Sequence, residues 1–258
     1  MLGKLLKHEV RAISHIVFPL YGMALIVVAL SKLTMVFGWF DSPNLWLKLP
    51  SGIITFAMVI ALLGVMFISM ISLIMRFYKN LMGDEGYLMF TLPVTGTQLL
   101  ASKLISAVGT MLCSTAFIAA CVLFLLGEIP DFSAIETVVN PFVILLVLFI
   151  AFTVGITVNF LLFYMSMAIG PQIMQNRLVG SIIAYIAITT ILQIAGVVLM
   201  GIGALTTINL SLPGFALTMN AFDIMACICG GIMIIMAVMG TIFFFITRHF
   251  ITKKLNLA

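Results

Sequence analysis

Histidine and cysteine side chains are the groups in this sequence best suited to bind a metal or to act as nucleophiles. The histidines stand near the ends of apolar stretches without an acid at ligand spacing, and the cysteines stand inside such stretches. A cysteine must ionise to bind a metal, which is unfavourable in apolar surroundings. We therefore expect free thiols, no catalytic residue, no metal site and no cofactor in this chain. These residues are His8, His15, His249, Cys113, Cys121, Cys227 and Cys229.

A second set of residues could bind a ligand or another helix by hydrogen bonds. Polar residues recur at every fourth position in the apolar stretch that follows Leu178, and this spacing lines one face of a helix. Hydroxyl and amide groups in hydrocarbon seek partners or water, so the face should point into a bundle or a cavity. Two interpretations stay open, a substrate path and hydrogen bonding between helices. The stripe consists of Ser181, Tyr185, Thr189 and Gln193.

Small hydroxyl residues recur at the same spacing further upstream. Small side chains let two helices approach closely, and their hydroxyl groups can bond across the contact. We expect a close helix contact along this stripe, which consists of Ser102, Ser106, Thr110 and Ser114.

The segment between Arg76 and Lys103 combines two acids with aromatic and aliphatic residues. Asp84 can cap a short helix that ends before Pro93. The segment is more apolar than a solvated loop, so one side should be covered, either by the membrane or by another protein. Docking of the short helix into a groove of a partner is the favoured interpretation. The docking residues would be Asp84, Glu85, Tyr87, Leu88 and Phe90.

The composition shows what kind of elements must position these residues. Of the 258 residues, 64% are hydrophobic and only 8% are charged, and the mean hydropathy is +1.32. Soluble domains carry about 25% charged residues. The composition therefore excludes a soluble enzyme and a disordered chain, and the net charge of +4 comes without the basic run of a nucleic-acid-binding domain. We expect an all-α membrane protein.

Six apolar stretches are long enough to cross a bilayer, which takes about 20 residues. The prolines fall between these stretches or at their edges, so none interrupts the centre of a span. We predict a single transmembrane domain, residues 1–258, with six helices. The predicted spans lie at about 17–38, 51–75, 104–126, 141–169, 179–204 and 224–247.

The basic residues predict the orientation of these spans. All of the twelve lysines and arginines except Lys32 and Lys48 fall on the side of the membrane that holds both termini. Because basic residues are enriched in cytoplasmic segments, both termini should lie in the cytoplasm. Trp39 and Trp46 then lie at the outer interface, where tryptophan is enriched.

Two segments are expected to do something other than span the membrane. Residues 1–16 contain an amphipathic helix with a basic arc and an apolar arc, which should lie along the inner leaflet as an interfacial helix. Glu9 points out of the apolar arc, so that face should meet protein as well as lipid. Residues 201–222, before the sixth span, carry no charge. They can re-enter the membrane or form an apolar loop, and both interpretations stay open.

The run from Asp84 to Val94 (Asp-Glu-Gly-Tyr-Leu-Met-Phe-Thr-Leu-Pro-Val), followed by Gln-Leu-Leu-Ala-Ser-Lys up to Lys103, resembles the inner loop of bacterial ABC-2 type transporter permeases. The amphipathic segment 1–16, the six-span layout and the basic C-terminal segment that contains Lys253 and Lys254 are also typical of that family. The resemblance implies that the short helix after Asp84 is a coupling helix and that residues 1–16 are the connecting helix beside it. It further implies that the fifth span helps to line the substrate path. It also implies a second permease subunit, identical or paralogous, and a separate ATPase that binds ATP and Mg.

The sequence therefore predicts a non-catalytic permease subunit of an ATP-driven exporter in the bacterial plasma membrane. No charged residue lies deep in a predicted span, which argues against ion-coupled transport and favours energy from a partner. We expect an amphipathic or hydrophobic substrate, for example an antimicrobial or other peptide. The expected partners are the ATPase, the second permease and membrane lipids, but not nucleic acid. The alternatives are an interaction, immunity or sensor protein without transport, and a secondary transporter or channel.

Overall fold

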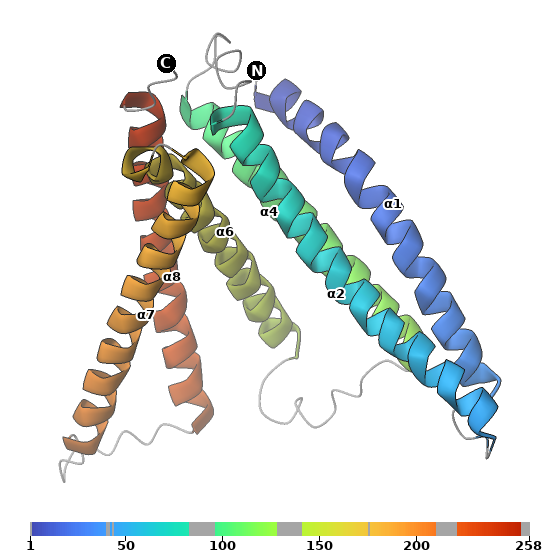
Figure 1. Ribbon diagram of the computed structural model, residues 1–258. Helices are drawn as coiled ribbons and strands as arrows, with labels where there is room; N and C mark the ends of the chain where they lie inside the picture. Colours follow the sequence, from blue (N-terminus) through green and yellow to red (C-terminus); the bar gives the residue numbers. More distant parts are fainter. Residues whose placement is uncertain are drawn as a thin grey trace. The chain divides into compact units, whose positions relative to one another are not determined.

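The computed structural model of the protein describes residues 2–39, 42, 44–82, 96–127, 141–174, 176–209 and 221–253. Within these residues the regular structure is entirely α-helical, and each of six helices is long and apolar enough to cross a membrane. The all-α, six-span prediction is thereby confirmed, and by helix length and hydropathy the chain is a multi-pass membrane protein. The helices are α1 (Leu2–Val36), α2 (Leu45–Met82), α4 (Gly96–Leu126), α6 (Pro141–Ile173), α7 (Arg177–Asn209) and α8 (Ala221–Lys253) (Figure 1).

Helix α1 differs from the prediction, because the expected interfacial helix of residues 1–16 is not a separate element. The helix runs unbroken from Leu2 through Pro19 to Val36. At 35 residues it is about 52 Å long, well beyond the hydrocarbon thickness of about 30 Å. The amphipathic start therefore continues directly into the first span. Its apolar arc packs on neighbouring helices, where Ile13 and Val17 are buried, so the segment has a protein surface to cover it.

Two other predicted segments lie partly or wholly outside the described residues. The short docking helix between the second and third spans falls in residues 83–95, which the structure does not describe. Helix α7 continues to Asn209 and takes in the first part of residues 201–222, the segment before the sixth span. Residues 210–220 are again outside the described part, and α8 begins at Ala221.

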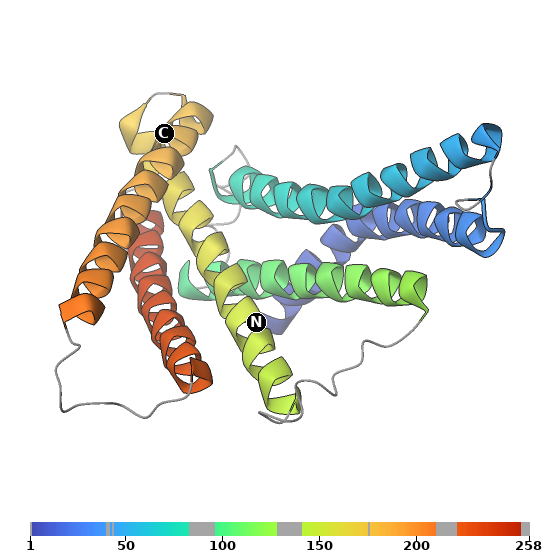
Figure 2. The same cartoon turned by 90° about the horizontal axis from the view of Figure 1, so that it is seen from below.

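The chain divides into two compact units, of which the first is Met1–Ile156. Helices α1, α2 and α4 of this unit pack side by side, with α2 antiparallel to the other two (Figures 1 and 2). Val28, Met58, Leu62 and Cys121 form a buried apolar cluster between them. We call these three helices the three-helix body.

Hydroxyl residues of α4 face the interior of the three-helix body. Ser102, Ser106 and Ser114 are all buried, and each donates a hydrogen bond to a backbone carbonyl of its own helix. Thr110 is partly buried and bonds in the same way. The stripe of small hydroxyl residues thus lies in a helix contact, as its spacing predicts.

The second unit, Thr157–Ala258, contains the rest of α6 together with α7 and α8. Helices α6 and α7 touch backbone to backbone where Gly170 meets Gly180 and Ser181. A Cβ added to either glycine would lie within 3.0 Å of backbone atoms of the other helix, a separation that real Cβ atoms essentially never show. Gly240 of α8 approaches the side chains of Val158 and Leu161 on α6. Glycine at these points lets the helices of this unit approach closely.

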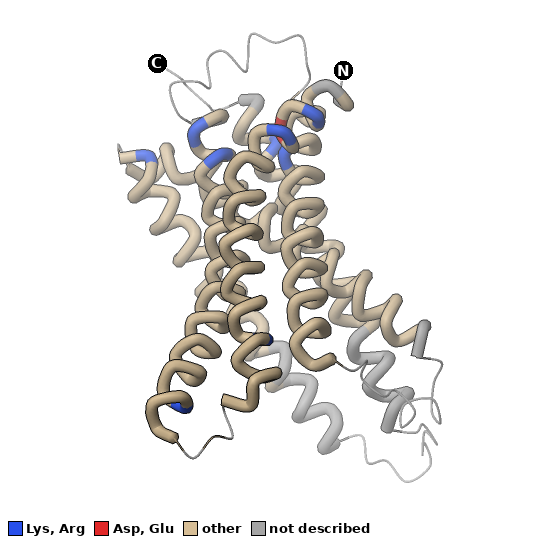
Figure 3. The backbone as a smooth tube through the Cα atoms, turned by 90° about the vertical axis from the view of Figure 1, so that its right-hand side faces the viewer, with Lys and Arg blue, Asp and Glu red and all other residues tan. Residues whose placement is uncertain are grey.

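Charge is distributed unevenly along the three-helix body. Lysines and arginines gather at the end where α1 begins, α2 ends and α4 begins (Figure 3). Lys32, near the end of α1, and Lys48, near the start of α2, lie at the opposite end. Among the described residues, the body therefore has a basic end, and Lys32 and Lys48 are the charged residues near its other end.

Candidate functional site

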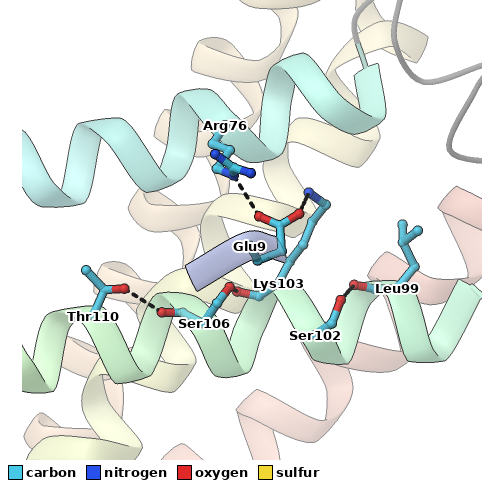
Figure 4. Close-up of polar contacts among 7 residues, drawn as sticks. All are labelled: Glu9, Arg76, Leu99, Ser102, Lys103, Ser106 and Thr110. Carbon is cyan, nitrogen blue, oxygen red and sulfur yellow. Dashed lines mark hydrogen bonds and ion pairs between the residues drawn. The ribbon is translucent and has the colours of Figure 1, made fainter. Parts of the chain in front are cut away.

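A buried ion cluster joins the three helices at the basic end of the body. Glu9 extends from α1, Arg76 from α2 and Lys103 from α4 (Figure 4). Arg76 Nε donates to Glu9 Oε2 over 2.6 Å, and Lys103 Nζ donates to Glu9 Oε1 over 2.9 Å. The side chains of Glu9 and Lys103 are 6% and 4% exposed, and that of Arg76 is 22% exposed. One carboxylate thus bonds cations from two different helices.

The position of Glu9 in the amphipathic start of α1 explains this arrangement. Glu9 lies on the same helix face as Ile13 and Val17, and that face packs against α2 and α4. A carboxylate carried into such a contact must be paired, because burying an isolated charge is very unfavourable. The expectation that the apolar arc of α1 meets protein is therefore confirmed, and Arg76 and Lys103 provide the pairing.

The cluster is suited to holding the three helices together. Both carboxylate oxygens of Glu9 accept charge-assisted hydrogen bonds, so the acid is occupied as an acceptor. In the part of the chain that the structure describes, no group of three or more His, Cys, Asp or Glu residues could hold a metal ion. The two hydrogen bonds that Glu9 accepts therefore connect α1 to α2 and to α4 at one end of the three-helix body.

A second polar contact joins the same helices further along the body. The hydroxyl groups of Tyr21 and Ser114 are 2.8 Å apart, and Ser114 Oγ lies 3.4 Å from Ser69 Oγ. The ring of Tyr21 also stacks on Phe117, with 4.4 Å between ring centroids. Residues of α1, α2 and α4 again meet at one point, here through hydroxyl groups in an apolar interior.

The third contact ties α1 to the opposite end of α4. Lys32 Nζ donates to the backbone carbonyl of Leu125 over 2.8 Å and lies 5.8 Å from the ring centroid of Phe124. The last carbonyls of a helix lack partners in the helix itself, and they carry partial negative charge that favours a cation. Helices α1 and α4 are thus connected by polar contacts at three levels.

The predicted substrate-path stripe of α7 is divided by the structure into two halves. Ser181 is buried against α6 and donates to the carbonyl of Arg177, and the ring of Tyr185 stacks on Phe163 of α6, with centroids 4.6 Å apart. Thr189 donates to the carbonyl of Tyr185, and Gln193 is exposed. Ser181 and Tyr185, the first half of the stripe, pack on α6. Thr189 and Gln193 therefore remain as the candidates to line a substrate path.

An apolar groove lies on the first unit, between α4 and the first half of α6. Its volume is about 650 Å³, and it is lined by residues of α4 from Leu112 to Ala119 and of α6 from Leu145 to Phe152. The hydroxyl group of Thr115, its polar member, already bonds to carbonyls of α4. The groove therefore offers an apolar surface to whatever occupies it.

The predicted docking residues Asp84, Glu85, Tyr87, Leu88 and Phe90 lie outside the described residues. The helices on either side of them are described, however. Arg76 lies within two helical turns of the end of α2, and Lys103 lies within two turns of the start of α4. The ion cluster is therefore close in sequence to both ends of the docking segment.

Sequence reasoning missed the roles of Arg76 and Lys103, which the charge pattern presented only as markers of orientation. Glu9 is the residue from which these roles could have been predicted, since an acid in an apolar arc requires a cation nearby. Gly170 and Gly180 were also missed, because a single glycine in an apolar stretch does not reveal which helix approaches it.

Comparisons of the chain with protein-family models, with curated proteins and with solved structures give no match.

Proposed function

We propose that the chain is the membrane-spanning permease subunit of an ATP-driven exporter of the ABC-2 type. In this proposal a separate cytoplasmic ATPase binds ATP and Mg and docks on residues 84–90. Both termini lie in the cytoplasm of a bacterium, and a second copy or a close paralogue completes the path. The observation that supports the proposal best is the ion cluster, because it ties the start of α1 to both helices that flank the docking segment.

The cluster supports a way of transmitting movement from the ATPase to the membrane. A displacement of residues 84–90 would act on the end of α2 and on the start of α4. Since Glu9 bonds to both of these helices near that point, α1 would move with them rather than separate. Breaking a buried ion pair typically costs about 3–5 kcal/mol, so α1 would remain bound to α2 and α4 during the movement. The three-helix body would move as one piece during alternating access.

The surfaces of the protein favour an amphipathic or hydrophobic substrate, such as a peptide with apolar side chains. On the first unit, the groove between α4 and the first half of α6 offers an apolar surface. On the second unit, α7 exposes the amide of Gln193. Each of these surfaces could contact one part of a substrate that has both apolar and hydrogen-bonding groups.

The test is to purify the protein from its native membrane and to ask whether an ATP-hydrolysing subunit accompanies it. The double variant Tyr87→Ala with Leu88→Ala should reduce the amount of ATPase that copurifies, because truncating interface anchors often costs about 2 kcal/mol or more. Trp46→Ala is the control, since Trp46 is 90% exposed and lies at the other end of α2. It should retain the ATPase.

Absence of any nucleotide-hydrolysing partner from the wild-type preparation would contradict the proposal. It would favour a membrane interaction protein or a transporter that works alone. Full retention of the ATPase by the double variant would instead show that the docking segment is elsewhere.

A further inference from the structure

One face of α2 next to the ion cluster carries a cation with donors to spare. Arg76 uses Nε to bond Glu9, whereas a guanidinium group has five N–H donors in a planar fork. Its side chain is 22% exposed, so it is not fully enclosed by protein.

Lys79 adds a second cation on the same side of α2. It is exposed and lies three residues after Arg76, which places the two positions about 60° apart around the helix axis. Both positions are close to the end of the candidate span Leu45–Asn80, where the hydrocarbon of a bilayer gives way to headgroups. A phosphate group at this depth could therefore be reached by both side chains.

An apolar ridge lies directly along α2 from these cations toward the middle of the span. Ile68, Ile71 and Met75 are 45%, 57% and 40% exposed, and their spacing of three and four residues places them on one face together with Lys79. Ser72 on the same face donates its hydroxyl hydrogen to the carbonyl of Ile68. The distance along the helix from Ile68 to Lys79 is about 16 Å, which is close to the thickness of one leaflet, about 15 Å.

We infer that this face of α2 binds an anionic phospholipid, with its phosphate at Arg76 and Lys79 and an acyl chain along Ile68, Ile71 and Met75. The charge complementarity selects a lipid with a net negative headgroup over a zwitterionic one, because a zwitterionic headgroup brings its own cation to the site. The ridge selects a lipid over free phosphate, which has no apolar part to bury. Glu9 holds the guanidinium of Arg76 in place for this contact. The inference does not depend on the proposed transport function.

The experiment uses the full-length protein purified in a neutral detergent, with the thermal unfolding midpoint as the readout. Dioleoyl phosphatidylglycerol is titrated against dioleoyl phosphatidylcholine, and inorganic phosphate is titrated separately. Lys79→Gln removes one cation without touching the buried ion pair. Lys48→Gln is the matched control, because Lys48 is also exposed on α2 but lies near its other end.

Phosphatidylglycerol should raise the midpoint at lower concentration than phosphatidylcholine does, and inorganic phosphate should have little effect. Lys79→Gln should weaken the apparent affinity for phosphatidylglycerol about fivefold, and Lys48→Gln should leave it unchanged. Equal effects of the two lipids would overturn the inference. So would equal losses in the two variants, or protection by inorganic phosphate that matches the lipid. Each readout is independent of any ATPase, so failure here would leave the proposed function standing.

Discussion

Lys103 Nζ on α4 lies 2.9 Å from Glu9 Oε1 on α1, and the two side chains are only 4% and 6% exposed. The other oxygen of the same carboxylate accepts the Nε proton of Arg76 on α2. In the sequence these partners are 94 and 67 positions away from Glu9. A single acid therefore joins the N-terminal segment to the helices on both sides of residues 83–95.

Removing this acid should destabilise the three-helix body. Glu9→Gln removes the carboxylate that pairs with the buried ammonium group of Lys103, and removing one partner of a buried pair typically costs about 3–5 kcal/mol. Arg76 is partly exposed and a lysine can extend toward water, so we expect a smaller loss of about 2 kcal/mol in the free energy of unfolding. Unfolding in mixed micelles by titration with SDS measures it. Lys7→Gln, exposed on the same helix, should change it by less than about 0.5 kcal/mol.

Combining Glu9→Gln with Lys103→Met tests whether the two residues act as a pair. The double variant removes both members of the pair, so its loss should be smaller than the sum of the two single losses by about 1 kcal/mol or more. The same unfolding assay supplies all four free energies of the cycle. Simple additivity would show that the 2.9 Å contact contributes nothing to stability.

The close contact of α6 with α7 should depend on glycine at position 180. Gly180→Ala would place a Cβ against the backbone carbonyl of Gly170, so the helices must separate, and we expect a loss of about 1–3 kcal/mol. Gly196→Ala is the control on the same helix, where the structure shows no atom within 4 Å of the added Cβ. It should be neutral or slightly stabilising, because alanine favours a helix more than glycine does. Unfolding midpoints of the two variants should therefore move differently, and similar midpoints would argue against the contact.

The two halves of the polar stripe on α7 should respond differently to substitution. Tyr185→Leu removes the ring that stacks on Phe163, and stability should fall by about 0.5–1.5 kcal/mol. Gln193→Leu removes an exposed amide and should leave the stability of the purified chain unchanged. Under the proposed function, it should alter export or substrate-stimulated ATPase activity. A loss of stability with Gln193→Leu as large as that with Tyr185→Leu would assign the whole stripe to helix packing.

The orientation predicted from the charges can be tested by labelling single cysteines in a cysteine-free background. A cysteine at Ser42 or Thr207 should react with an impermeant thiol reagent in intact cells. A cysteine at Asn80 should react only after the cells are opened, because the basic end of the body should face the cytoplasm. Labelling of the Asn80 variant in intact cells would reverse the orientation, whereas the lipid site on α2 would then simply face the other leaflet.

The sequence alone was sufficient for the class of protein and for the number of spans. A membrane span is defined by the apolar content of about 20 consecutive residues, and this is a local sum that can be read without knowing any contact. The acid in the apolar arc of α1 and the hydroxyl stripe of α4 were also visible in this way, since residues on one helix face follow from spacing alone.

Tertiary structure decided which helices these faces meet. Glu9 could have been paired with any nearby cation, and the rotation and register of three helices select Arg76 and Lys103. The same packing makes residues 1–16 part of one continuous helix, brings Gly170 against Gly180, and divides the α7 stripe between Tyr185 and Thr189. Such pairings depend on how side chains of distant segments fit together, and the apolar content of each segment carries no information about that fit.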